Sequence, residues 1–106
     1  MAFKSQVVPN IGTTLTVVSP TVASGLTATI IGFALSNITA LNITVSAKVN
    51  KAGASSAYIV KDALVMPGGA LILVGGDQKI VLEYNDSISV SSSAATSVDS
   101  IVSYLI

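Results

Sequence analysis

The chain has 106 residues, of which 51% are hydrophobic and 9% charged, and five basic side chains balance five acidic ones. It lacks Cys, His, Trp and Arg, which excludes disulfides, the common zinc ligand sets, the usual nucleophile–base pairs and bidentate arginine recognition of phosphate. Since no net positive charge would attract them, nucleic acid and anionic membranes are not expected as partners.

Hydroxyl side chains supply most of the polarity, with 15 Ser and 9 Thr. Charged residues are far below the roughly one quarter that is usual in soluble domains. A neighbouring molecule that covers such a surface would therefore desolvate little charge. The composition fits a subunit of an assembly, and it fits equally a soluble domain of low charge.

The first ten residues, MAFKSQVVPN, precede the first clear strand and are set off from it by Pro9-Asn10. They lack the long apolar core and the small-residue cleavage site of a secretory signal. We predict an N-terminal arm over residues 1–10. Because no shift in composition divides the remainder, we predict a single domain over residues 11–106.

The most apolar window covers residues 17–36 and contains Pro20, Gly25 and Gly32. A membrane-spanning helix needs about 20 predominantly apolar residues. This window is instead rich in Ser, Thr and β-branched residues, and no basic cluster lies beside it. Two strands joined by a turn describe it better than a spanning helix.

Most other segments have the period of two that is typical of strands. Residues 41–49 alternate apolar and polar side chains without a fault, which predicts a half-buried antiparallel strand. Residues 28–35, 70–74 and 101–106 are apolar on both faces, which predicts strands buried inside a sandwich or against a partner. Further strand candidates are residues 13–18 and 87–91.

Turn signals separate these segments at intervals of about 8–12 residues, and no segment has the capping signals of a helix. The sequence therefore predicts an all-β fold. We expect an immunoglobulin-like or jelly-roll-like antiparallel β-sandwich of about seven to nine strands.

The stretch PGGALILVGGD, residues 67–77, raises the question of a phosphate-binding loop. Such a loop ends in Gly-Lys-Ser/Thr at the start of a helix, whereas here Asp77 follows the second glycine pair and a strand-like segment comes next. Pro67-Gly68 fits the central positions of a type II turn, where glycine supplies the positive φ. We interpret the glycines as turn residues and the segment between them as a core strand.

Asp77, Glu83 and Asp86 form the one cluster of acids, with Asp62 before them. Carboxylates on flexible loops are the ligands that calcium prefers, but this spacing matches no calcium loop with ligands at alternate positions. We interpret these residues as exposed acids at strand ends and turns. We predict no metal site, no cofactor and no catalytic residue.

The aromatic side chains are few and dispersed, which argues against a base-stacking platform. A sugar-binding face would need exposed aromatic rings. We expect Phe33 in the core, and we favour the core less strongly for the three tyrosines, Tyr58, Tyr84 and Tyr104.

The chain ends in an apolar strand that runs to its last residue. Because an exposed apolar edge strand invites aggregation unless it is paired, this segment is either a central strand of the sandwich or part of a subunit contact. We favour the first. The candidate subunit-interface residues, near the two ends of the chain, are Phe3, Val7, Val8, Tyr104, Leu105 and Ile106.

The second half of the chain contains a progression of short motifs that alternate with turns. They are Tyr58-Ile59-Val60-Lys61-Asp62-Ala63, Pro67-Gly68-Gly69, Leu73-Val74-Gly75-Gly76-Asp77-Gln78-Lys79, Leu82-Glu83 and Asp86-Ser87-Ile88-Ser89-Val90. This progression resembles that of a recurring small virion protein of tailed bacteriophages. The first half is similar more loosely, through Val18-Ser19-Pro20 and the segment from Thr27 to Gly32. Related sequences often have Gly before the Asp of the last turn, where this chain has Asn85, a residue that also tolerates left-handed conformations.

The resemblance implies a β-sandwich building block of a phage particle and brings no catalytic residues. We accordingly expect a non-enzymatic virion protein, either a capsid decoration or cement protein or a collar or neck protein, that clamps neighbouring subunits. Its partners would be other virion proteins and further copies of itself, and its location the virion. The alternative is a small tail or fibre module that binds a host receptor or glycan.

Overall fold

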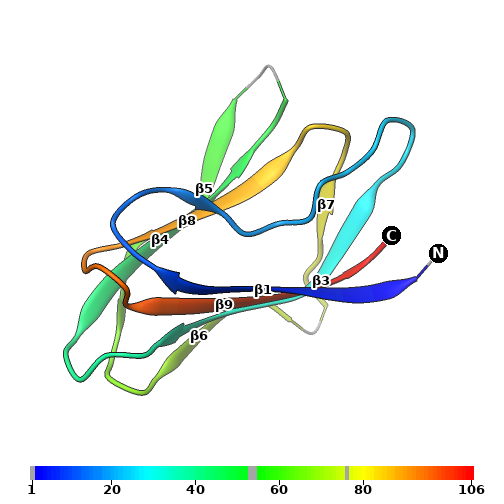
Figure 1. The fold of residues 1–106 in the computed structure, drawn as a ribbon. Coiled ribbons are helices and arrows are strands. Elements are labelled where there is room, and N and C mark those ends of the chain that lie inside the picture. The colour runs from blue at the N-terminus through cyan, green and yellow to red at the C-terminus, as the bar shows by residue number, and fades with distance from the viewer. Residues whose placement is uncertain (1, 53–54, 76) are drawn as a thin grey trace.

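The computed structural model describes residues 2–52, 55–75 and 77–106, which form nine β-strands in two antiparallel sheets. The described residues contain no helix. The all-β sandwich predicted from the sequence is confirmed, with a strand number inside the expected range (Figure 1). The strands are β1 (Phe3–Ile11), β2 (Thr16–Val17), β3 (Ala28–Asn37), β4 (Ile43–Asn50), β5 (Ser56–Val65), β6 (Ala70–Val74), β7 (Ile80–Leu82), β8 (Ser87–Ser92) and β9 (Val98–Leu105).

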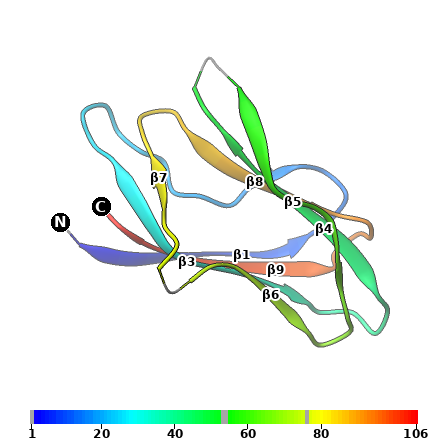
Figure 2. The ribbon, with the colours of Figure 1, turned by 180° about the vertical axis from the view of Figure 1, so that it is seen from behind.

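One sheet contains five strands and the other four. The five-stranded sheet has the order β1-β9-β3-β6, and β7 pairs with the first part of β3. The four-stranded sheet has the order β2-β8-β4-β5. Figure 2, from behind, shows β1, β9, β3 and β6 in one layer and β8, β4 and β5 in the other.

The C-terminal strand β9 lies in the middle of the five-stranded sheet. It pairs with β1 on one side and β3 on the other, so its backbone is hydrogen-bonded along both edges. Beyond β9, Ile106 and Ala2 exchange backbone hydrogen bonds of 2.6 and 2.9 Å, and the two termini lie side by side in Figure 1. The interpretation of the C-terminal segment as a central strand is confirmed.

The segment predicted as an arm, residues 1–10, lies within the sheet from Phe3 onward as the edge strand β1. Pro9-Asn10, predicted as a boundary, is instead part of a β-bulge within this strand, where the register with β9 shifts between Val8 and Ile11. Two contacts hold the strand in place. Ile11 is buried in the core, and the Gln6 side-chain amide donates to the backbone carbonyls of Val18 and Ser19.

The core lies between the inner faces of the two sheets, as the period of two requires. The alternation over residues 41–49 places Ile43, Val45 and Ala47 inside, and Phe33 is buried as predicted. Of the two alternatives predicted for residues 70–74, burial inside the sandwich and burial against a partner, the first is wrong for β6. Val74 is buried, but Ile72 is 65% exposed because no described segment covers the outer face of the sheet there.

Both long edge strands, β1 and β5, are interrupted by a polar residue in a left-handed conformation. Asn10 has φ 58° and Asp62 has φ 53°, and the register shifts at both positions. A side chain of the neighbouring strand accepts the backbone N–H of each residue. Asp99 accepts from Asn10 at 3.0 Å, and Ser46 accepts from Asp62 at 2.9 Å. Bulges of this kind twist an edge away from flat pairing with another chain.

We expect Leu35→Ala to lower the free energy of unfolding by about 2–5 kcal/mol, since Leu35 is fully buried and the change leaves a cavity between the sheets. The matched control is Leu64→Ala, at a position that is 63% exposed, where a change within about 0.5 kcal/mol is expected. Urea unfolding followed by circular dichroism measures both. Equal losses in the two variants would contradict the placement of the core.

Candidate functional site

The glycine-rich stretch after β5 forms turns and no phosphate loop. The backbone N–H of Gly69 donates to the carbonyl of Met66 at 2.9 Å, and Gly68 has φ 70°. These values are typical of a type II turn with Pro67 and Gly68 at its two central positions. After β6, Gln78 donates to the carbonyl of Gly75 at 3.3 Å and the chain continues into β7. The predicted Pro67-Gly68 turn is confirmed. The glycines at 76 and 53, both assigned to turns, lie outside the described residues.

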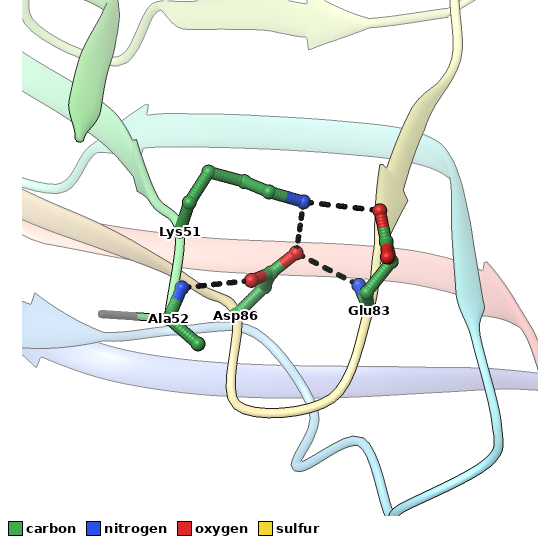
Figure 3. A network of polar contacts seen from close by, with 4 residues as sticks. All are labelled: Lys51, Ala52, Glu83 and Asp86. Atoms are coloured by element: carbon green, nitrogen blue, oxygen red, sulfur yellow. Dashed lines mark hydrogen bonds and ion pairs between the residues drawn. The ribbon is translucent and has the colours of Figure 1, made fainter. Parts of the chain in front are cut away.

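The acidic cluster differs from the sequence interpretation at Asp86, which is buried and not exposed. Its carboxylate contacts the Lys51 ammonium and accepts two backbone hydrogen bonds, from Ala52 at 3.0 Å and from Glu83 at 2.9 Å (Figure 3). Glu83 stays exposed and lies 3.4 Å from the Lys51 ammonium. The prediction was wrong for Asp86 because burial and a partner 35 residues away decide its environment.

The turn between β7 and β8 positions this carboxylate. Asp86 N–H donates to the carbonyl of Glu83 at 3.0 Å, and Asn85 between them has φ 64°, a conformation in which asparagine is better tolerated than most residues. The carboxylate therefore points back at the end of β4, where Lys51 and Ala52 begin the next connection. It ties the turn that follows β4 to the turn that follows β7.

The protonation of Asp86 follows from these contacts. The hydrogen bond from Lys51, and then those from the backbone of Ala52 and Glu83, lower the pKa of Asp86 from 3.8 to about 2. The same hydrogen bond raises the pKa of Lys51. The Asp86 carboxylate thus accepts three donors and holds the two turns together.

Other buried polar side chains form hydrogen bonds with groups inside the fold. The Asn37 amide donates to the carbonyls of Leu41 and Val65 at 2.8 and 3.0 Å, and the hydroxyls of Ser92 and Ser97 lie 2.5 Å apart. Over residues 2–52, 55–75 and 77–106, every buried side-chain nitrogen or oxygen has a partner.

No pocket is found in the described part of the chain, nor any group of three or more side chains that would hold a metal ion. A search of the same residues for a helix long and apolar enough to cross a membrane finds none.

The candidate interface residues from the two ends of the chain are brought together by the pairing of β1 with β9, but they face in two directions. Phe3, Val7 and Leu105 share the outer face of the five-stranded sheet. Tyr104 is buried in the core, and Val8 and Ile106 pack partly against it.

The outer face of the five-stranded sheet, here called the apolar face, carries two rows of side chains that run across the strands. Residues paired in register share a face. The first row consists of Val7, Ile101, Ala34 and Ile72. The second row consists of Phe3, Leu105, Thr29 and Val81. Five of these eight side chains are large, apolar and about half exposed or more, so this face is apolar and uncovered.

The outer face of the four-stranded sheet is polar by contrast. It carries Lys48, Lys61 and Asp62, with serines along β8. The ammonium groups of Lys48 and Lys61 lie 5.9 and 5.5 Å from the ring centre of Tyr58, which is half exposed. This face also carries the exposed side chains of Val17, Tyr58 and Leu64, so it mixes charged, hydroxyl and apolar groups, whereas the two rows of the apolar face contain no charged residue. Sequence reasoning missed this because it shows which residues alternate but not which faces stay open.

The chain matches no family model, no curated protein and no solved structure.

We expect the stability of the protein to fall as the pH drops from about 4 to about 2. The folded state lowers the pKa of Asp86 to about 2, so the unfolded chain takes up this proton first as the pH falls. The contribution of Asp86 is therefore fully present above its ordinary pKa of 3.8 and is lost below it. Urea midpoints measured across this range test the prediction.

The variant Asp86→Asn should flatten this part of the pH profile. At pH 7 it should also lower the thermal midpoint by about 4–8 °C. The two backbone N–H groups bind different carboxylate oxygens, and asparagine replaces one of these oxygens with an NH2 group, which donates and does not accept. Asp77→Asn is the control, since Asp77 is an exposed acid in a turn. An Asp86→Asn profile as steep as that of the parent chain would contradict the assignment.

Proposed function

We propose that this chain is a non-enzymatic structural protein of a bacteriophage particle, a capsid decoration or cement protein or a collar or neck protein that clamps neighbouring subunits. Its partners would be other virion proteins and further copies of itself, with the virion as its location. The observation that carries the proposal is the apolar face, a sheet surface with large exposed side chains and almost no charge. Such a surface is typical of a protein that another molecule covers.

The sequence resemblance supports the same proposal from another side. The motifs that resemble phage virion proteins map onto β5 to β8 and the turns between them, so they concern the scaffold of the sandwich. A β-sandwich with an uncovered apolar sheet face is compatible with such a building block.

Mass spectrometry of purified particles of the phage that encodes this chain tests the proposal. We expect the protein in intact particles in multiple copies, at a constant ratio to the major capsid protein across a density gradient. The particle-free fractions of the same lysate are the control. Absence of the protein from intact particles would refute the proposal.

A second candidate function is that of a tail or fibre module that binds a host receptor or glycan. The observation that favours it is Tyr58, an exposed ring with two ammonium groups close by on a hydroxyl-rich face. An exposed aromatic ring can stack on a sugar, and neighbouring lysines would attract an acidic one.

This candidate predicts that the isolated chain binds acidic oligosaccharides on a glycan array and that Tyr58→Ala reduces binding at least about tenfold. Tyr84→Ala is the matched control, because Tyr84 is also half exposed but lies in the turn after β7 and not in β5. No binding, or equal loss in the two variants, would count against a glycan site at Tyr58.

A further inference from the structure

The strand connections give the two ends of the sandwich different compositions. Four connections, β1–β2, β3–β4, β5–β6 and β8–β9, gather at one end, on the left of Figure 1. They comprise residues 12–15, 38–42, 66–69 and 93–97 and contain no charged side chain. The β4–β5 and β7–β8 connections at the opposite end carry Lys51, Glu83 and Asp86. Charged residues are usually found on such surface loops, so the uncharged end differs from an ordinary loop surface.

The uncharged end, here called the apolar end, presents aliphatic side chains to solvent. Leu41 is 74% exposed and Met66 is 67% exposed. Ile38, which begins the β3–β4 connection, is about half exposed. Single exposed apolar side chains are normal on a protein surface, but these three stand on two adjoining connections that contain no charged residue. Exposed apolar patches of this kind mark interaction sites.

A buried amide fixes the two connections relative to each other. The Asn37 side-chain NH2 donates to the carbonyl of Leu41 at 2.8 Å and to the carbonyl of Val65, the residue before Met66, at 3.0 Å. Its side-chain oxygen accepts the backbone N–H of Thr39 at 2.9 Å. The exposed side chains of Leu41 and Met66 therefore project from a backbone that is already ordered. A partner that binds them has less conformational entropy to remove.

The composition of the apolar end favours a protein partner over a bilayer. Loops that enter a bilayer combine apolar tips with aromatic residues at the interface and with basic residues that contact lipid phosphates. The four connections contain no aromatic and no basic residue. At the centre of protein–protein contacts, by comparison, charged residues are depleted and methionine is enriched. The charged residue closest in sequence, Asp99 on β9, accepts the backbone N–H of Asn10 within the fold.

The size of the apolar end argues against a stable contact between the ends of two copies. Four strands span about 19 Å and two stacked sheets lie about 10 Å apart, so the end measures about 20 Å by 20 Å with its side chains. Two such ends would bury about 800 Å² in total, which is the size of a crystal-packing contact. A concave partner also contacts the sides of the loop tips and so buries more.

We propose that the apolar end docks onto a concave, uncharged and apolar surface of another protein of the particle, with Leu41 and Met66 as the anchoring side chains. The inference rests on the proposed structural function and adds to it which part of the chain makes the contact. The opposite end, with Lys51, Glu83 and Asp86, faces away from this partner.

Competition between two versions of the chain during phage growth tests the inference. The encoding phage is grown in cells that also express a variant, and peptide mass spectrometry compares the variant-to-parent ratio in purified particles with the ratio in the lysate. We expect at least about tenfold lower incorporation of Leu41→Lys and Met66→Lys, because each places an ammonium group in an apolar contact. Leu41→Met keeps an apolar side chain of similar volume and should be incorporated like the parent.

Leu26→Lys is the matched control, since it makes the same change at an exposed leucine in the β2–β3 connection, at the opposite end. It should be incorporated like the parent. Urea midpoints of all the lysine variants should stay close to that of the parent, because the replaced side chains are exposed.

Parent-like incorporation of Leu41→Lys and Met66→Lys would overturn the inference while the chain itself remains a particle protein. So would an equal loss in Leu26→Lys. Absence of the parent chain from intact particles would instead refute the proposed function, and the inference with it.

Two further measurements test the other possible occupants of the apolar end. We expect Leu41→Lys to leave the oligomeric state of the purified chain unchanged in sedimentation velocity, and the parent chain not to float with phosphatidylcholine vesicles. A dimer that Leu41→Lys abolishes and Leu26→Lys preserves would assign this end to a second copy. Vesicle binding with the same pattern would assign it to a lipid surface. Either result would overturn the inference.

Discussion

The structure depends on the double pairing of β9. This strand joins β1 to β3, so the five-stranded sheet exists only where β9 is in place. Its inner side chains, Val98, Val102 and Tyr104, belong to the core, while Ile101 and Leu105 lie on the apolar face. Strand β9 therefore pairs with two neighbours, contributes side chains to the core and lies at the centre of the outer surface. Its apolar residues on both faces allow it to do so.

Charge is scarce in this chain, and two of its charged side chains accept hydrogen bonds from backbone N–H groups. The carboxylate of Asp86 accepts two backbone N–H groups and joins two turns, and the carboxylate of Asp99 accepts the N–H of the bulge at Asn10. Ser46 does the same for Asp62 with a hydroxyl. In each case the geometry of an irregular segment is fixed by a side chain from a different strand or turn, and each such group is satisfied within the fold.

Features that depend on local pattern were predictable from the sequence, and features that depend on distant partners were not. The alternation over residues 41–49 and the Pro67-Gly68 turn follow from period and backbone preference alone. The boundary predicted at Pro9-Asn10 was wrong, because residues that commonly end a strand can also form a bulge inside one. The burial of Asp86 depends on Lys51, which is distant in sequence. The exposure of Ile72 depends on which face of the sheet stays uncovered, and no local pattern contains that information.

The two bulged edges matter for a protein without net charge. At a sequence pI of about 6.0 and net charge zero at pH 7, long-range repulsion between molecules is nearly absent, and most proteins in this state tend to precipitate. Here the strand edges themselves discourage sheet-to-sheet growth, because Asn10 and Asp62 interrupt the rows of backbone donors and acceptors. The backbone shape at β1 and β5 thus disfavours edge-to-edge pairing between copies in a molecule that has no net charge to keep them apart.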